Sequence, residues 1–157
     1  MGVSADVATV EVFRGDYFFL SNFFAHPIGV GGMTFATAEH AFAAAKTDLP
    51  DEKRAIAAAP TPAEAKRLGR EVTLRPDWDD IRLDVMREIV NIKFNDPTLA
   101  GQLLDTGDAL LREGNDWGDR FWGVCADESE NWLGRILMDK RRTLKSNQDQ
   151  VSSDPGT

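Results

Sequence analysis

The sequence contains few of the residues that build covalent or metal-bound scaffolds. It has one cysteine, Cys125, and two histidines, His26 and His40. A single cysteine excludes a disulfide within the chain, and this set of ligands argues against a structural zinc site. We therefore expect a fold held together by its apolar core, with no metal ion and no bound cofactor.

Long apolar runs and positive charge are also scarce. No segment is apolar over the roughly 20 residues that a membrane-spanning helix needs, and no signal-peptide core is visible. We therefore expect a cytoplasmic protein with no membrane partner. The formal net charge is −8, from 18 lysines and arginines against 26 aspartates and glutamates. This charge argues against a protein that coats nucleic acid, which needs many cationic contacts to phosphates. It still allows a local basic pocket for one phosphorylated ligand.

The common nucleotide-binding and hydrolase motifs are missing. The sequence contains no G-x-G-x-x-G, G-x-x-x-x-G-K-[ST], H-E-x-x-H or G-x-S-x-G pattern. It therefore gives no motif-based indication of a dinucleotide site, a P-loop, a zinc protease helix or a nucleophile elbow.

The length suits one domain with its own core. We predict an ordered domain at residues 9–145, a flexible N-terminus at 1–8 and a disordered, polar tail at 146–157. The fold class is α+β, a single, mainly helical domain with a few short strands. The pattern predicts strands at 9–13, 109–112 and 121–125, a hairpin at 26–35, and helices at 37–47, 51–59, 61–69, 77–95, 97–104 and 131–144.

The predicted helix at 37–47 is rich in alanine and carries three titratable side chains. Thr37 is placed to cap its N-terminus. Glu39 and Lys46 are seven residues apart, so a rotation of about 100° per residue returns them to nearly the same face. Such a helix is normally buried, and two buried charges need a reason. A structural ion pair is one, and a catalytic carboxylate beside an amine nucleophile is the other; we interpret His40 as structural.

Aromatic, acidic and glycine residues are concentrated between Glu113 and Gly123. Glycines allow the backbone to approach a ligand closely, and the face of a tryptophan such as Trp122 stacks on bases and sugars. A carboxylate such as Asp119 acts as a general acid or base, or binds ribose hydroxyls. The alternative is a surface loop with tryptophans in the core.

Two N-terminal segments have a similar character. Arg14 and Gly15 follow a predicted strand, where a guanidinium group can bind phosphate through two hydrogen bonds. Ser21 and Asn22 offer donors and acceptors between aromatic residues. The alternatives are a turn arginine and ordinary turn capping.

Together these segments resemble the NADAR family, whose name refers to NAD and ADP-ribose and which includes the riboflavin-intermediate N-glycosidases. The similarity extends from Phe13 to Leu144. Between residues 126 and 131 the family more often has a glycine shortly before the asparagine, where this chain has acidic residues. The matching motifs are F-R-G at 13–15, L-S-N-F at 20–23, A-E-H-A-F at 38–42 with the lysine at 46, A-K-R-L-G-R at 65–70, D-W at 77–78, K-F at 93–94, T-G at 106–107, D-x-x-W-G at 119–123 and N-W-L-G at 131–134.

The resemblance implies a mainly helical fold and the hydrolysis of N-glycosidic bonds. It implies two substrate classes, namely phosphorylated ribosylaminopyrimidine intermediates of riboflavin synthesis and ADP-ribosylated guanine in nucleic acid or nucleotide. In both, ribose C1 is attached to an exocyclic amine. One alternative is a non-catalytic module that binds ADP-ribose or NAD. Another is an antitoxin-type component that reverses ADP-ribosylation and has a toxin or defence-system partner.

The resemblance also implies the site residues. We predict that Glu39 moves protons and that Lys46 either attacks ribose C1 or positions the substrate. An apolar environment lowers the pKa of Lys46 and the Glu39 carboxylate raises it, so the sequence leaves the direction open. Catalytic roles are implied for Glu39, Lys46 and Asp119, and substrate-binding roles for Arg14, Gly15, Ser21, Asn22, Trp78, Trp122 and Asn131.

Overall fold

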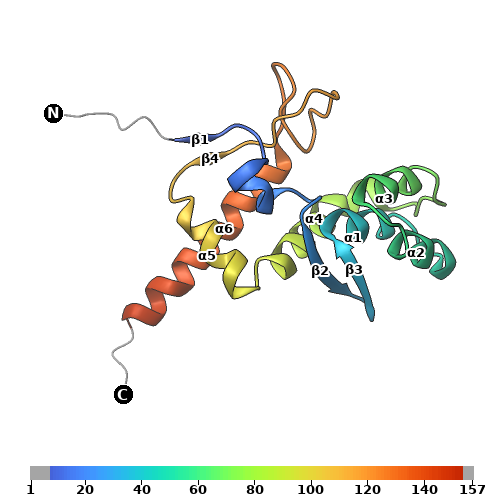
Figure 1. Cartoon of the computed structure of the whole chain (residues 1–157), viewed down its shortest axis with the longest axis horizontal. Coiled ribbons are helices and arrows are strands. Elements are labelled where there is room, and N and C mark those ends of the chain that lie inside the picture. The colour runs from blue at the N-terminus through green and yellow to red at the C-terminus, as the bar shows by residue number, and fades with distance from the viewer. Residues whose placement is uncertain (1–7, 154–157) are drawn as a thin grey trace. The chain divides into compact units, whose positions relative to one another are not determined.

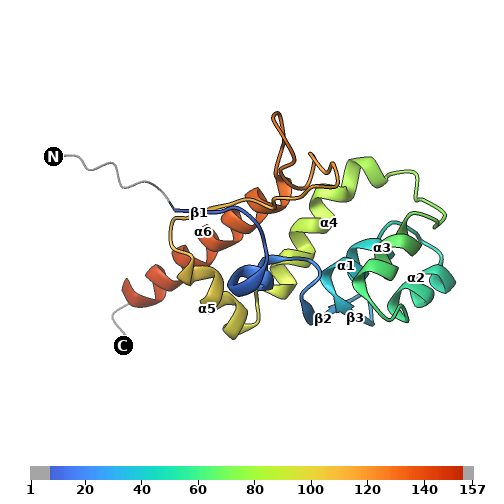
Figure 2. The ribbon, with the colours of Figure 1, turned by 45° about the horizontal axis from the view of Figure 1, so that its top comes forward.

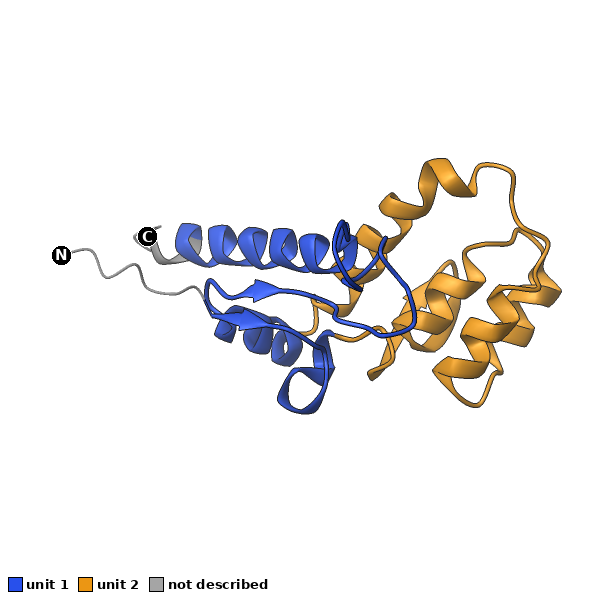
Figure 3. Ribbon diagram, turned by 90° about the horizontal axis from the view of Figure 1, so that it is seen from above, with its two compact units in different colours: residues 1–20, 97–157 blue, residues 21–96 orange. Residues whose placement is uncertain are grey.

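The computed structural model describes residues 8–153, which form mainly helices and a few short strands. The predicted α+β class is confirmed. The chain divides into two compact units (Figure 3), with unit 1 comprising Met1–Leu20 and Pro97–Thr157 and unit 2 comprising Ser21–Asp96. None of the helices in the described part of the chain is long and apolar enough to cross a membrane.

Unit 2 begins with a β-hairpin of strands β2 (Ala25–Val30) and β3 (Met33–Thr37) (Figure 1). Its turn, Gly31–Gly32, has φ values of +59° and +80°, which glycine adopts without steric cost. Ile28 pairs with Phe35, and both side chains are buried. The predicted hairpin is confirmed.

Four helices complete unit 2, and two of them begin at a threonine cap, of which the one at Thr37 was predicted. The Thr37 hydroxyl accepts a hydrogen bond from the backbone N–H of His40, and the Thr61 hydroxyl accepts one from Glu64. Each cap satisfies a backbone donor that the first turn leaves unpaired. The helices are α1 (Ala38–Ala44), α2 (Pro50–Ala57), α3 (Pro62–Gly69) and α4 (Trp78–Lys93).

Helix α1 ends three residues before the predicted end at position 47. The Lys46 N–H bonds to the Ala43 carbonyl at 3.3 Å, which tightens the last turn. The next helical bond to the Lys46 carbonyl would come from Pro50, which has no N–H. That carbonyl instead accepts from the N–H of Arg75 at 2.8 Å.

Small residues bring α3 close to α1, and both lie beside α2 in unit 2 (Figure 2). A Cβ atom at Gly69 would lie 2.9 Å from the Cβ of Ala43, so only glycine fits this approach. Ala43 and most of α1 are buried, as the alanine-rich pattern predicts.

Unit 1 combines a parallel pair of short strands with two helices and a 3-10 helix (Figures 1 and 2). Leu133, Ile136 and Leu137 lie on one buried stripe of the last helix, at helical spacing. The elements are β1 (Thr9–Val10), η1 (Gly15–Leu20), α5 (Pro97–Asp105), β4 (Leu110–Leu111) and α6 (Trp132–Ser153).

Two predictions about unit 1 are wrong. The strand predicted at 121–125 is absent; near it, Val124 makes only an isolated bridge to Gly114. The amides of Phe121 and Trp122 donate to the Asp119 carboxylate and are therefore lost to a strand ladder. In addition, α6 continues through residues 146–153, which we predicted as disordered.

The extension of α6 has a simple reason, because the first proline after Trp132 is Pro155 and no glycine intervenes between Gly134 and that proline. Residues 154–157 of the predicted tail and residues 1–7 of the predicted flexible N-terminus lie outside the described residues.

Candidate active site

The start of α1 is held by the Ser21–Asn22 segment of unit 2. The Asn22 carbonyl accepts a hydrogen bond from the backbone N–H of Glu39 at 3.0 Å, and the Asn22 amide donates to the Met86 sulfur at 3.6 Å. The Ser21 hydroxyl accepts from the Phe23 N–H at 3.1 Å. The half-buried Glu39 is therefore fixed through its backbone, and both Ser21 and Asn22 have structural contacts.

His40 is integrated into the core, which agrees with our structural interpretation of this residue. It is 1% exposed, and its Nε2 donates to the Ala59 carbonyl at 3.0 Å. Since a carbonyl only accepts, Nε2 carries the hydrogen, and Nδ1 forms a hydrogen bond with the Thr37 hydroxyl, 2.7 Å away. Both nitrogens are occupied by the protein, so His40 orients α1.

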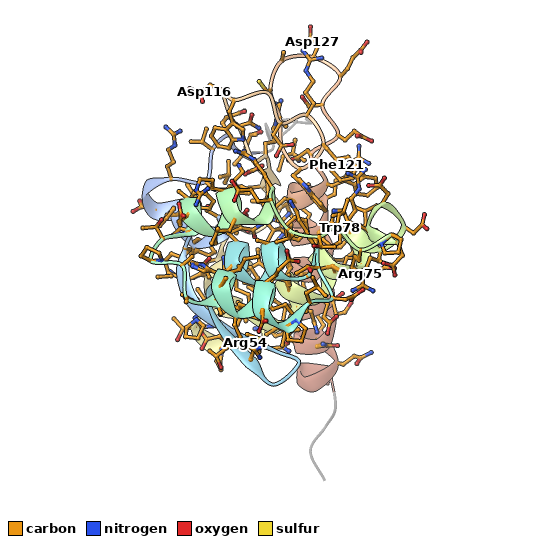
Figure 4. The ribbon with its side chains drawn as sticks, turned by 90° about the vertical axis from the view of Figure 1, so that its right-hand side faces the viewer. Arg54, Arg75, Trp78, Asp116, Phe121 and Asp127 are labelled. Carbon is orange, nitrogen blue, oxygen red and sulfur yellow. The ribbon has the colours of Figure 1, made fainter. Side chains whose placement is uncertain are left out.

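Lys46 and Trp78 come together at the other end of α1. The Lys46 amine lies 5.8 Å from the centre of the Phe42 ring, and that ring packs on Trp78 at 5.1 Å with a tilt of 60°. The backbone adds a second link, because the Arg75 N–H donates to the Lys46 carbonyl and the Arg75 carbonyl accepts from the Trp78 N–H. Arg75 and Trp78 are labelled in Figure 4. Unit 2 therefore brings two of the predicted site residues into one aromatic-lined cluster. Trp78 is mostly buried there, at 7% exposed.

The structure settles the direction in which the Lys46 pKa moves. Burial is the largest cause and lowers the pKa below its usual value of 10.5. The Glu39 carboxylate opposes this, while the positive charges of Arg70 and Lys66 lower the pKa further. The net result is a lowered pKa, which favours the neutral, nucleophilic amine.

In unit 1, Asp119 and Trp122 belong to an ordered loop. The Asp119 carboxylate accepts from the N–H of Phe121 at 3.1 Å and of Trp122 at 2.9 Å. The Asn115 side chain bridges the N–H and carbonyl of Asp119, at 3.0 and 2.9 Å. One carboxylate oxygen of Asp119 thus shapes the backbone that carries Trp122, whose ring meets Phe121 edge-on at 4.8 Å.

Two excursions of the same region project outward, as the positions of Asp116 and Asp127 in Figure 4 show. Between them, Gly123 is packed against Glu113 and Asn115 so closely that a Cβ atom would collide with both. The glycine at this position therefore serves close packing within the loop.

Asn131 closes this region onto strand β4. Its side-chain oxygen accepts from the Glu113 N–H at 3.1 Å, and its side-chain nitrogen donates to the Leu111 carbonyl at 2.9 Å. A Cβ atom at Gly134 would collide with the Leu111 carbonyl and the Asn131 amide. These contacts are structural, and the substrate-binding role of Asn131 stays a prediction.

Arg14 and Gly15 lie at the surface of unit 1, at the start of η1. Gly15 has a φ of +58°, which explains the glycine after Arg14. The Arg14 carbonyl accepts from the Tyr17 N–H at 3.0 Å. Their predicted phosphate-binding role stays a prediction.

Unit 1 also contains two pockets that the sequence did not indicate. One, of about 460 Å³, lies between β4, the 124–131 loop and the start of α6, and Asn131 is the predicted site residue that lines it. The other, of about 350 Å³, is lined by β1, η1 and α5. Within residues 8–153, no group of three or more His, Cys, Asp or Glu side chains is arranged to hold a metal ion.

Lys93 is a candidate that sequence reasoning missed. It is the last residue of α4 and is 1% exposed, and its amine donates to the Ser21 carbonyl at 2.8 Å. Burial lowers its pKa to about 7. The K-F motif at 93–94 was the available signal, but a lysine in the last turn of a helix is ordinarily a surface residue.

Comparison with known proteins supports the resemblance in the sequence. The family model described as the NADAR domain matches residues 12–145. A riboflavin biosynthesis protein of Vibrio vulnificus is 44% identical over 131 residues, and the match covers 81% of this chain and 35% of that protein. An N-glycosidase of Nostoc punctiforme is 40% identical over 133 residues, with 80% of this chain and 85% of that protein covered.

A solved structure has the same fold. The NMR structure of Escherichia coli YbiA superposes with a TM-score of 0.79 at 33% identity, covering 90% of this chain and 86% of that chain. YbiA is named an N-glycosidase. The chain thus spans most of the length of YbiA and of the Nostoc protein, but about a third of the Vibrio protein.

Proposed function

The chain belongs to the NADAR family, and from this premise we propose that it is an N-glycosidase that hydrolyses the bond between ribose C1 and an exocyclic amine. Two relatives named N-glycosidase are matched over 85% and 82% of their lengths, which supports this activity. The observation that carries the proposal is that the half-buried carboxylate of Glu39, on α1, acts electrostatically on the amine of Lys46, which lies just after α1 and has a lowered pKa.

The proposed substrates are phosphorylated ribosylaminopyrimidine intermediates of riboflavin synthesis. The name of the Vibrio relative, a riboflavin biosynthesis protein, supports this class. ADP-ribosylated guanine contains the same type of bond and is the second candidate, on chemical grounds. A toxin or defence-system partner stays a prediction of the family resemblance.

In the proposed mechanism, the ribosylamine opens its sugar ring to an imine at C1. Glu39 moves the proton that ring opening and departure of the amine require. The Lys46 lone pair attacks C1, the C1–N bond to the heterocycle breaks, and the leaving amine takes up a proton. Water then hydrolyses the Lys46 Schiff base and regenerates the free amine. The net reaction consumes one water and releases the heterocyclic amine and the free sugar.

Other residues have supporting roles in the proposal. Trp78 packs beside Phe42 in unit 2, and its stacking on the base or ribose stays a prediction. In unit 1, two roles stay predictions: the binding of phosphate by Arg14, and the binding of ribose and base by Asp119 and Trp122. The alternative to the Schiff-base mechanism is direct attack of water on C1, in which Lys46 only positions the substrate.

Turnover is tested by incubating the protein with a ribosylaminopyrimidine phosphate and, separately, with ADP-ribosylated guanosine, and by following the products with mass spectrometry. We expect Glu39→Gln to abolish turnover while substrate binding persists. Lys145→Met, which removes an exposed lysine of α6, is the matched control and should retain turnover. Binding of both compounds without cleavage by the wild type would instead identify a non-catalytic module.

Borohydride reduction during turnover tests the covalent step. We expect a sugar adduct on the peptide that contains Lys46, and no adduct in Lys46→Met. If no adduct forms and Lys46→Ala remains active, Lys46 is not the nucleophile and direct attack by water is the mechanism.

A further inference from the structure

The amine of Lys93 lies in an apolar part of unit 2. The rings of Phe24 and Phe94 are centred 5.5 and 5.2 Å from it, and the Ser21 carbonyl accepts its hydrogen bond at 2.8 Å. A buried amine is costly, and a methionine would fill a similar volume without that cost. The amine therefore has a use that an apolar side chain would not supply.

No charged neighbour in unit 2 explains the presence of this amine. Helix α1 and strand β2, which pack on α4, carry Glu39, His40 and His26 as their titratable groups. None of the three contributes to the pKa of Lys93, which burial alone lowers. The partner of the amine is a backbone carbonyl, so its role concerns backbone position.

The backbone carbonyl that Lys93 binds is adjacent in sequence to the carbonyl that binds the Glu39 amide. The amine binds the Ser21 carbonyl, and the adjacent Asn22 carbonyl accepts from the Glu39 N–H at 3.0 Å. Met86, two turns earlier on α4, binds the Asn22 amide and gives a second anchor. Helix α4 thus fixes the Ser21–Asn22 segment, and this segment fixes the first turn of α1.

We propose that Lys93 is a positioning residue for the reaction, which holds the Ser21–Asn22 segment so that Asn22 keeps Glu39 in place at the start of α1. The catalytic meaning of this role rests on the proposed function. The hydrogen bond from an ammonium group is roughly twice as strong as one from a neutral amine, so loss of the proton weakens the hold on Glu39. Activity should then fall as the pH rises above about 7. Attack by Lys46 requires loss of a proton and has the opposite dependence.

Amide hydrogen exchange of Glu39 tests the positioning without reference to activity. In Lys93→Met we expect the Glu39 amide to exchange about tenfold faster, since the segment that binds it loses an anchor. The His40 amide, which is bonded to the Thr37 hydroxyl, should keep its wild-type rate.

Lys53→Met is the matched control variant. Lys53 also donates to a backbone carbonyl, that of Ala44 at 3.0 Å, but at the opposite end of α1. Its replacement should leave the exchange of the Glu39 amide unchanged. The wild type alone also tests the proposal. The protection of the Glu39 amide against exchange, relative to that of the His40 amide, should decrease as the pH rises from about 6 to about 8.

The kinetic expectation for Lys93→Met is a decrease in kcat of about tenfold with KM within about twofold, and loss of the decline in activity above neutral pH. Unchanged Glu39 exchange in folded Lys93→Met, or wild-type Glu39 protection that does not depend on pH, would overturn the proposal. If the wild type cleaves neither substrate, the proposed function fails, while the exchange measurements still decide whether Lys93 positions Glu39.

Discussion

Replacing Lys93 with methionine should stabilise the folded protein near neutral pH, and the gain should shrink as the pH rises. The folded protein holds this amine at a pKa of about 7, whereas the ordinary value is 10.5. Between these two values the unfolded chain binds more protons than the folded protein. The unfolding free energy of the wild type therefore rises with pH in this window. The stability gained from Lys93 in this way is lost again as the pH falls towards 7. Methionine does not titrate, so the variant lacks this contribution.

The magnitude follows from the two pKa values. Each pH unit well inside the window is worth about 1.4 kcal/mol. The folded amine is half protonated near pH 7, so the wild type gains about 2 kcal/mol between pH 7 and about pH 9. Near pH 7 the buried amine costs about 4 kcal/mol in total. An unsatisfied Ser21 carbonyl would cost the variant roughly 1 to 3 kcal/mol. Lys93→Met should therefore be more stable than the wild type by about 1 to 3 kcal/mol near pH 7 and about equal to it near pH 9.

Urea unfolding of the wild type and of Lys93→Met across this pH range measures the difference directly. The pKa values of Lys46 and Lys53 are also lowered by burial, and their contribution is common to both proteins and cancels. Lys145→Met serves as the control for removing a lysine from the surface and should keep the wild-type slope. A difference between wild type and Lys93→Met that stays constant from pH 7 to about pH 9 would refute the reasoning.

Two further predictions concern packing and backbone contacts. Gly69→Ala should lower the unfolding free energy by about 1 to 3 kcal/mol, because the new Cβ atom would lie 2.9 Å from the Cβ atom of Ala43. The control, Gly101→Ala on α5, would place its Cβ atom where no atom lies within 4 Å and should be neutral or stabilising. Equal effects of the two variants in urea unfolding would contradict the packing argument. Asn131→Ala should cost about 2 to 4 kcal/mol, from two lost hydrogen bonds and a φ of +53°, and Asn131→Gly about 1 kcal/mol less because glycine tolerates that φ. Equal thermal stability of the two Asn131 variants would contradict this division.

Features that depend on neighbouring residues could be predicted from the sequence. The caps at Thr37 and Thr61 are local, since each hydroxyl binds an N–H three residues ahead. The hairpin turn at Gly31–Gly32 is local for the same reason, because its backbone angles require glycine. The positions of these elements were therefore correct to within a few residues.

The failed strand at 121–125 shows where local pattern is insufficient. Its apolar run, Phe-Trp-Gly-Val-Cys, resembles a strand, but the Asp119 carboxylate accepts from the amides of Phe121 and Trp122. A side chain that binds the backbone competes with a strand ladder for the same donors. The sequence offers no indication of which acceptor wins, because that depends on how Asn115 shapes the loop.

Lys93 was missed for a related reason. At the end of a helix a lysine usually complements the helix dipole from the surface, and nothing in its immediate neighbourhood indicates burial. Its partner, the Ser21 carbonyl, is 72 positions away in the sequence. The buried position of the amine is a consequence of tertiary packing in unit 2, where Phe24 and Phe94 surround it.

The same limit explains why the sequence could indicate that Glu39 and Lys46 lie near each other but left open the direction in which the pKa of Lys46 moves. A spacing of seven residues suffices to predict a shared face, and a single neighbouring carboxylate would by itself raise the pKa of Lys46. Burial outweighs this effect and lowers the pKa of Lys46, and Lys66 and Arg70 at the end of α3, which Gly69 allows to approach α1 closely, lower it further. A bulkier residue at position 69 would therefore do more than strain the packing. By moving these cations away from Lys46 it would let the Glu39 carboxylate raise the pKa of the amine, and so oppose the neutral form that the proposed attack on C1 requires.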